Sequence, residues 1–430
     1  MQEEEEITLR RLLLFGVAAI AGALVLMMVA RGANAQDGAP PSPSAGTMLV
    51  DGLLQPRGTV VGPDGLIYIA EAGSGGDTEF VTDDGVTLHN GFTGRISAVD
   101  PDTGERTTVA GELPSSATEE GEAIGPADVA FLGDQLYLLL THGGEAWGFP
   151  DTPTGIYEVN DDGSIDLVAD IYEFNVDNPV EAVTSGAQQD VEVGGNPYSM
   201  MTRGGNFYVV DGNHNRLMEI TPDGDITEVV EFPDHPVSTG IDAGSTGPFY
   251  VAYLGQGPFL PEAGKVVQVS TTGTITEVAS GVPMLTDVEI GPSNVVYALS
   301  FADGFAPGTG SIVKVAGTSF TPVVAGLTFA TSMEFIGDTA YVLNDGINAL
   351  GTGQLWEIEN ISTQQPPATP TAAASPTAPA ATPTRTGVTA PDTGTGPGEG
   401  GTDVTVLLLA LGLAATALVA GGGALALKRR

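Results

Sequence analysis

A short pattern of apolar and polar positions recurs six times between residues 56 and 344. Each copy contains an apolar strand, a tight turn rich in glycine and aspartate, and a second strand that carries a tyrosine. Alternation of apolar and polar positions with a period of two predicts half-buried β-strands. After two longer intervals, the spacing between the tyrosines settles in the forties, as in a β-propeller whose blades have four strands each. The six tyrosines are Tyr68, Tyr137, Tyr208, Tyr250, Tyr297 and Tyr341.

A third and a fourth strand follow in each repeat, except that the sixth repeat lacks its fourth strand. The third strand of this last repeat is predicted at residues 355–358. Just before the first repeat, residues 47–56 (TMLVDGLLQP) resemble the fourth strands of the other repeats. An open ring would leave strand edges unpaired, so we expect residues 48–50 to pair with residues 355–358. The sequence therefore predicts an all-β, six-bladed β-propeller over residues 46–362, closed by an N-terminal strand.

The chain begins with a segment typical of secretion. Residues 12–30 are apolar, follow two arginines, and lead to Ala33-Asn34-Ala35, which has the small-x-small form of a signal-peptidase site. We predict a signal peptide at residues 1–35 and a Pro/Ser spacer at residues 36–45. The apolar run is also long enough for the alternative, an uncleaved N-terminal membrane anchor.

Beyond the propeller the composition changes twice. Residues 363–403 are rich in Pro, Thr, Ala and Gly, which favours a disordered stalk, and they include the motif APDTG at residues 390–394. Residues 404–427 carry no charge and are long enough to span a bilayer as a transmembrane helix. The basic tail, residues 428–430, favours a cytoplasmic C-terminus. We expect a single-pass membrane protein that holds its propeller on the extracellular face of the cell membrane.

The charge balance and the absence of cysteine remove two classes of function. The chain has 14 Lys and Arg against 54 Asp and Glu, a formal net charge of −40. A surface this acidic repels the phosphate backbone, so we expect no nucleic-acid partner. Because the chain has no cysteine, thiol catalysis and cysteine-ligated metals are excluded as well.

Three strings resemble the ScyD/ScyE family: QPRGTVVGPDGLIYIAEAGSGG at residues 55–76, GELPS at residues 111–115 and GGNPYSMM at residues 194–201. Residues 207–224, FYVVDGNHNRLMEITPDG, are similar to an NHL repeat, a form shared by six-bladed propellers of the NHL, gluconolactonase and strictosidine-synthase kind. The resemblance implies a secreted six-bladed propeller without a firmly assigned reaction. The C-terminal APDTG resembles a sortase sorting signal, although Ala390 stands where that signal has leucine.

All long inserts of the repeats fall on one face of the predicted ring, which we call the insert face. This face carries the connections from the second strand to the third and from the fourth strand to the next repeat. The opposite face, the hairpin face, carries short turns. Long loops on a rigid scaffold often have a function, so we expect ligands to bind on the insert face. The inserts are residues 72–94, 141–155, 172–196, 254–264, 301–310 and 345–353.

Polar residues near the ends of several strands suggest a metal site. Glu71, Asp211 and Asn344 follow the tyrosines of their repeats by three positions, and Asp128 and Asp287 lie near the start of first strands. Gluconolactonase-like propellers hold a divalent cation in the central channel. The resemblance therefore implies that these five side chains could bind Ca²⁺ or another divalent cation through oxygen. The alternative is that they are solvated residues at loop boundaries, or caps on channel water.

Four further residues are candidates for ligand binding. Trp147 and Phe149 lie in the second long insert, where they could stack on a sugar or pigment ring or cover the insert's own small core. Arg57 lies near the start of the first repeat, and His142 lies at the start of the second insert. The histidines of the chain show no metal-binding spacing, and there is no nucleophile elbow of the G-x-S-x-G kind.

These observations favour a ligand-binding or scaffold module of the ScyD/ScyE type that acts through its insert face and is not an enzyme. Its expected partners are the membrane, through the C-terminal helix, and an extracellular small molecule, glycan or protein. The first alternative is a divalent-metal-dependent hydrolase of the lactonase or gluconolactonase kind, although those enzymes place a glutamate where this chain has Pro56-Arg57-Gly58. The second alternative is a structural surface or adhesion module, in keeping with the acidic surface and the stalk.

Overall fold

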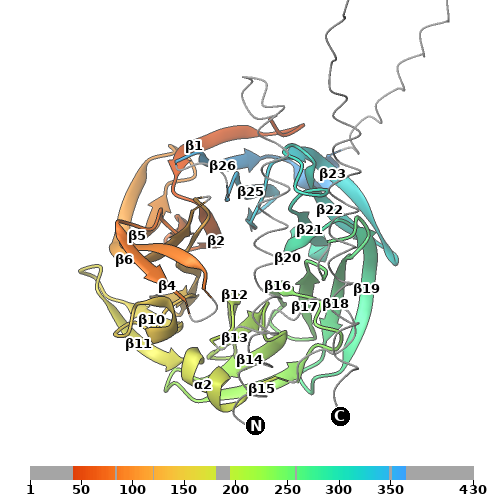
Figure 1. Cartoon of the computed structure of the whole chain (residues 1–430). Coiled ribbons are helices and arrows are strands. Elements are labelled where there is room, and N and C mark those ends of the chain that lie inside the picture. Colours follow the sequence, from red (N-terminus) through yellow and green to blue (C-terminus); the bar gives the residue numbers. More distant parts are fainter. Residues whose placement is uncertain are drawn as a thin grey trace, which may run out of the picture. The chain divides into compact units, whose positions relative to one another are not determined.

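The computed structural model describes residues 42–82, 85–119, 121–180, 194–256, 259–347 and 351–364. In these residues six antiparallel sheets stand around a common axis like the blades of a propeller (Figure 1). The predicted all-β, six-bladed propeller is thereby confirmed. The predicted signal peptide, transmembrane helix and basic tail lie outside the described residues, as does most of the predicted stalk. Within the described part, no helix is long and apolar enough to cross a membrane.

The first three blades contain the largest additions to the four-stranded plan. Blade 1 consists of β2 (Pro56–Val61), β3 (Ile67–Glu71), β5 (Thr87–Val99) and β6 (Arg106–Thr118), extended by β4 (Thr78–Val81) and β7 (Ala123–Ile124). Blade 2 consists of β8 (Pro126–Leu132), β9 (Gln135–Leu140), β10 (Gly155–Val159) and β11 (Ile165–Asp170), with the 3-10 turn η1 (Glu145–Trp147). The helix α2 (Ile171–Asp177) leads to blade 3, which consists of β12 (Pro197–Arg203), β13 (Asn206–Asp211), β14 (Arg216–Ile220) and β15 (Ile226–Glu231).

The last three blades have four strands each. Blade 4 consists of β16 (Ser238–Asp242), β17 (Phe249–Tyr253), β18 (Gly264–Val269) and β19 (Ile275–Val282). Blade 5 consists of β20 (Leu285–Ile290), β21 (Val296–Ser300), β22 (Gly310–Ala316) and β23 (Ser319–Leu327), with the 3-10 turn η2 (Pro292–Asn294). Blade 6 consists of β24 (Ser332–Ile336), β25 (Thr339–Asn344), β26 (Gly353–Ile358) and β1 (Thr47–Leu53), and the 3-10 turn η3 (Ile361–Thr363) follows it.

The sixth blade is closed by a strand from the N-terminal side of the propeller. β1 pairs antiparallel with β26, with Val50 opposite Leu355. Val50 and Leu53 are buried against apolar residues of blades 1 and 6. The predicted closure is confirmed, and it covers the edge of β26 that would otherwise be unpaired.

The repeated tyrosine of the second strands joins neighbouring blades. In four blades the tyrosine ring packs against a phenylalanine of the next blade, with ring centroids 4.5 to 5.2 Å apart. The hydroxyl group reaches a polar side chain, as where Tyr208 donates to Glu219 at 2.8 Å. An apolar ring with a polar tip suits a position between two blades, and this explains why tyrosine marks the repeat. The ring pairs are Tyr68–Phe131, Tyr137–Phe207, Tyr208–Phe249 and Tyr297–Phe335.

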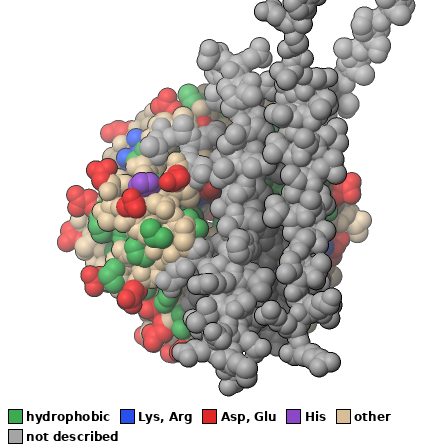
Figure 2. Space-filling model, viewed as in Figure 1, with side chains coloured by type: hydrophobic (Ala, Val, Ile, Leu, Met, Phe, Trp, Pro, Cys, Tyr) green, Lys and Arg blue, Asp and Glu red, His purple; other side chains and the backbone are tan. Residues whose placement is uncertain are grey.

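The outer surface of the blades is acidic. On the side shown in Figure 2, acidic side chains are spread over the described surface and basic ones are few. This distribution agrees with the formal net charge of −40. The field around the propeller therefore attracts cations and repels anions.

Candidate functional site

The first strand of each blade lies innermost and lines the central channel (Figure 1). These strands are β2, β8, β12, β16, β20 and β24. Each pairs with its own blade on one side only, so its other edge presents backbone N–H and C=O groups to the channel. Buried backbone groups need hydrogen-bond partners. Polar side chains of the same strands supply several of them.

Asp128 and Asp287 link the first strands of neighbouring blades. Asp128 of β8 accepts a hydrogen bond from the amide of the following residue at 2.8 Å and one from the amide of Met200 in β12 at 2.7 Å. Asp287 of β20 accepts from the amide of the following residue and from Met333 in β24 at the same distances. Each carboxyl group thus holds one amide of its own blade and one of the next.

The preceding blade leaves room for each of these carboxyl groups because it has glycine at the facing position. A Cβ atom at Gly58 would lie 2.1 Å from Oδ1 of Asp128, and one at Gly240 would lie 2.7 Å from Oδ1 of Asp287. The following blade has serine in both cases. The order of channel residues therefore repeats after half a turn of the ring: Gly58, Asp128 and Ser199 in blades 1 to 3, then Gly240, Asp287 and Ser332 in blades 4 to 6.

Threonines make further links between blades on one side of the ring. The hydroxyl groups of Thr239, Thr286 and Thr331 each donate at 2.9 Å to a carbonyl oxygen of the next blade. For Thr331 that oxygen belongs to Pro56, so this set also joins blade 6 to blade 1. The channel is asymmetric at this level, because the equivalent positions in blades 1 to 3 hold Arg57, Ala127 and Tyr198.

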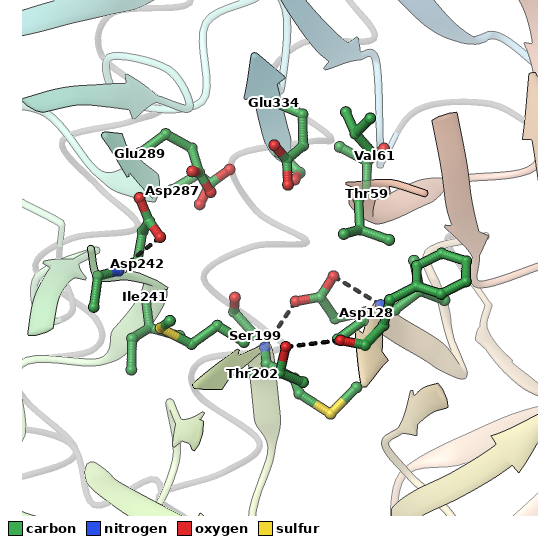
Figure 3. Close-up of a pocket in the computed structure, with 18 of the residues that line it drawn as sticks. Thr59, Val61, Asp128, Ser199, Thr202, Ile241, Asp242, Asp287, Glu289 and Glu334 are labelled. Atoms are coloured by element: carbon green, nitrogen blue, oxygen red, sulfur yellow. Dashed lines mark hydrogen bonds between the residues drawn. The ribbon is translucent and has the colours of Figure 1, made fainter. Parts of the chain in front are cut away.

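Three more carboxyl groups lie two residues further along the first strands of blades 4 to 6, toward the hairpin face. Asp242 at the end of β16 accepts a hydrogen bond from the amide of Ile290 in blade 5 at 2.7 Å, which makes it a third link between blades. Glu289 of β20 and Glu334 of β24 occupy the equivalent positions and point into the channel (Figure 3). Glu289 and Asp242 face the same part of the channel from neighbouring blades.

A cavity of about 520 Å³ occupies the part of the channel that these strands enclose. We call it the acidic cavity, because Asp128, Asp242, Asp287, Glu289 and Glu334 all line it (Figure 3). Its described lining contains no Lys, Arg or His. The lining begins at the third or fourth residue of every first strand except β24, and it extends to the last two or three residues of each strand. The acidic cavity therefore lies toward the hairpin face, whereas the sequence led us to expect binding on the insert face.

Burial shifts the titration of the acidic cavity toward neutral pH. Burial raises the pKa of Asp128 to about 7, and burial together with the charge of Asp128 raises the pKa of Asp287 to about 8. Burial, followed by the charge of Asp242, raises the pKa of Glu289 and of Glu334 well above the ordinary range. A cation bound among these groups would stabilise their charged forms and release protons.

Three of the predicted metal ligands form hydrogen bonds or ion pairs in or next to their own blades. Glu71 forms a two-point ion pair with Arg95, at 2.7 and 2.9 Å, and accepts from a backbone amide of the preceding connection. Asp211 accepts from three backbone amides, and Asn344 accepts from one at 2.7 Å. All three side chains are buried. They hold the loops that border the first strands, so they lie at loop boundaries but are buried rather than solvated.

The other two predicted ligands, Asp128 and Asp287, do line the acidic cavity. In the part of the chain that the structure describes, however, no group of three or more His, Asp or Glu side chains is arranged to hold a metal ion. The predicted set of five thus divides between the channel and the loops.

The predicted ligand-binding residues lie outside the acidic cavity. Trp147 stacks on His142 with ring centroids 3.7 Å apart, and Phe149, which is 6% exposed, packs edge-on against Phe92. Trp147 thus contacts a residue of its own insert, whereas Phe149 contacts the insert of blade 1. Arg57 lies at the insert-side end of the channel and donates to a backbone carbonyl group of the next connection.

Asp242, Glu289 and Glu334 were not among the residues predicted from the sequence. A strand places residues two positions apart on the same side, so the channel-facing Asp287 indicates that Glu289 faces the channel as well. Polar residues at alternate positions of the first strands could therefore have predicted this site from the sequence.

No protein-family model and no curated protein matches the chain. Solved structures similar to it include the PQQ-bound aldose sugar dehydrogenase from Streptomyces coelicolor, with 15% identity, a TM-score of 0.48, and coverage of 75% of this chain and 99% of that chain. A gluconolactonase from Xanthomonas campestris has 11% identity and a TM-score of 0.45, with 75% and 95% covered. A streptogramin B lyase has 14% identity and a TM-score of 0.43, with 75% and 98% covered. No activity of this chain follows from likenesses at these levels, and its class, the six-bladed β-propeller, rests on its own sheet topology.

Proposed function

We propose that the protein is an extracellular propeller of the ScyD/ScyE type that binds a cation in its acidic cavity. The observation that carries the proposal is a cavity lined by five carboxyl groups, with no Lys, Arg or His in its described lining. Negative charges held together in a buried space repel one another, and a cation relieves that repulsion. Protons compete for the same groups, so cation affinity should rise as pH rises.

The side-chain contacts favour a cation that is bound by the cavity as a whole over one that is bound by a preformed set of metal ligands. Asp128, Asp242 and Asp287 each hold an amide of the next blade, whereas Glu334, among the described residues, accepts only from the amide of the residue that follows it, at 3.3 Å. Glu289 and Glu334 are therefore the more adaptable groups. Ca²⁺ takes oxygen ligands and also accepts water among them, so it suits such a site. An organic amine would use the same charges.

Isothermal titration with Ca²⁺ and with 1,4-diaminobutane at pH 8 tests the proposal. One unit charge about 6 Å away at an effective dielectric constant of about 20 contributes about 2–3 kcal/mol, so Glu289→Gln with Glu334→Gln should weaken binding at least about tenfold. Glu105→Gln with Glu262→Gln is the matched control, because it removes two exposed glutamates and should leave affinity unchanged. An equal loss in both variants would attribute binding to net charge, and no binding of either cation would refute the proposal.

A second candidate function, acid–base hydrolysis, is favoured by the position of Glu289 and Asp242 in the wall of one cavity. Neighbouring carboxyl groups in a buried site can serve as an acid and a base. This arrangement supports the hydrolase alternative, with lactones as the first substrates to test. Glu289→Gln and Asp242→Asn should each abolish turnover if it exists, while Glu262→Gln should not. Absence of turnover in the unaltered protein would leave the binding function alone.

We further propose that the propeller is displayed outside the cell after removal of residues 1–35. Residues 363–403 would act as the stalk and residues 404–427 as the membrane anchor, as their sequence patterns suggest. Protease added to intact cells should then release a soluble propeller by cleavage between Gln364 and Thr402. Failure of release from an accessible stalk would indicate a second anchor at the N-terminus.

A further inference from the structure

The insert-side end of the channel is occupied by residues that do not line the acidic cavity. Arg57 and Tyr198 are the second residues of β2 and β12, so they lie on the insert side of Asp128 and Ser199, where the lining begins. The two residues lie at the same level of the channel, Arg57 in blade 1 and Tyr198 in blade 3.

A short segment, residues 121–124, runs beside them as the end of the connection from blade 1 to blade 2. We call it the strap. Gln55 holds it twice, because Nε2 donates to the carbonyl oxygen of Gly121 at 2.6 Å and Oε1 accepts from the amide of Ala123 at 2.8 Å. Arg57 donates from Nη2 to the carbonyl oxygen of Ala123 at 2.5 Å and lies 3.7 Å from a carboxylate oxygen of the strap.

Gln55 holds the strap from an unusual backbone conformation. Its φ of 51° lies in the left-handed region, which residues other than glycine rarely adopt, and the residue is 1% exposed. Such conformations persist where surrounding contacts impose them, and they are frequent in segments that switch. The strap also pairs with β6 at two positions, the amide of Thr118 donates to the carbonyl oxygen of Glu122, and Ala123 is buried. Gln55 and Arg57 supply the side-chain contacts that hold the strap against the start of β2.

We propose that the strap, Arg57 and Tyr198 form a gate that closes the channel on the insert face. With the gate closed, cations reach the acidic cavity from the hairpin face, past Val61 and Ala243. Release of the strap from Gln55 opens a second route. Arg57 adds an electrostatic barrier on the closed side, because its guanidinium group repels an approaching cation. The choice of a cation rests on the proposed function, whereas the closure rests on the contacts of the strap.

A single introduced thiol can report access to the acidic cavity, because the chain has no cysteine. Ser332→Cys places this thiol in the cavity wall, at a position that is 8% exposed. The probe is a trimethylammonium methanethiosulfonate, and the measurement is its rate of reaction with the thiol in the full chain. Val61→Trp with Ala243→Trp narrows the hairpin-face route from opposite blades. Gln55→Ala with Arg57→Ala releases the strap.

We expect the two tryptophans to slow the reaction severalfold while the strap is held, and we expect strap release to restore the rate. A reaction that the tryptophans do not slow would show that the insert face is already open. A slowed reaction that strap release does not restore would show that the barrier lies elsewhere. Either result would overturn the gate.

Three controls keep the test decisive. Gln55→Ala and Arg57→Ala as single variants serve if the double variant does not fold, which circular dichroism and melting show. A neutral thiosulfonate of similar size separates steric closure from charge, since Arg57→Ala should favour the cationic probe over the neutral one. The thiol reaction needs no bound ligand, so its failure and a failure of the Ca²⁺ titration are distinguishable.

Discussion

Gly58→Ala should destabilise the propeller through the channel link that Asp128 makes. The new Cβ would lie 2.1 Å from Oδ1 and 2.6 Å from Cγ of Asp128, and 2.7 Å from the carbonyl oxygen of Ala127. Overpacking of this kind costs about 1–3 kcal/mol. If the carboxyl group turns away, the buried amide of Met200 loses its partner, at about 1–3 kcal/mol more. We therefore expect a loss of about 2–6 kcal/mol in the free energy of unfolding.

Urea unfolding followed by circular dichroism measures this loss, with Gly111→Ala as the matched control. A Cβ at Gly111 meets only one atom, at 3.6 Å, so that variant should leave stability unchanged or raise it by up to about 1 kcal/mol. In an Asp128→Ala background two of the three close contacts of Gly58→Ala disappear, and its penalty should fall by more than about 1 kcal/mol. Equal effects of Gly58→Ala and Gly111→Ala, or an unchanged penalty in the Asp128→Ala background, would refute the reasoning.

Three further predictions follow from the described structure. The free energy of unfolding should fall as pH rises from 5 to 8. The reason is that Asp128 and Asp287 have pKa values of about 7 and about 8 in the folded protein and about 3.9 in the unfolded chain. Asp128→Asn should make this dependence on pH weaker in urea unfolding. A chain that begins at Gly52 should lose several kcal/mol, since apolar surface worth about 25 cal/mol per Å² is exposed at the open blade, and an unchanged melting temperature would contradict the closure. Arg95→Ala should cost about 3–5 kcal/mol by leaving the buried Glu71 unpaired, and adding Glu71→Gln should recover much of it in thermal melts.

The fold was largely predictable because its signals are local and repeated. Period-two alternation identifies strands, and Tyr68 and its equivalents identify blades, since each strand pattern appears six times. The closing strand was predictable because the sixth repeat lacks a fourth strand, and β1 pairs with β26 as expected. Short turns leave little freedom in the register of the first strand against the second and of the third against the fourth.

The site was less predictable because its contacts join different blades. Glu71, Asp211 and Asn344 share a height on the second strands, but height does not reveal whether a nearby backbone amide or an arginine already satisfies the side chain. Glu289 and Glu334 come together with Asp242 through packing of blades 4 to 6, a relation that no local pattern contains. Long inserts also drew attention to one face, while the acidic cavity forms from the regular strands.

The order of glycine, aspartate and serine around the channel restricts how such a ring can change in size. Each aspartate needs the glycine of the blade before it and an amide of the blade after it, so one link spans three consecutive blades. Duplication of an aspartate blade alone, or loss of a glycine blade alone, would set an aspartate against a side chain that has a Cβ. At the level of the channel, an aspartate blade can therefore be added only together with the glycine blade that precedes it.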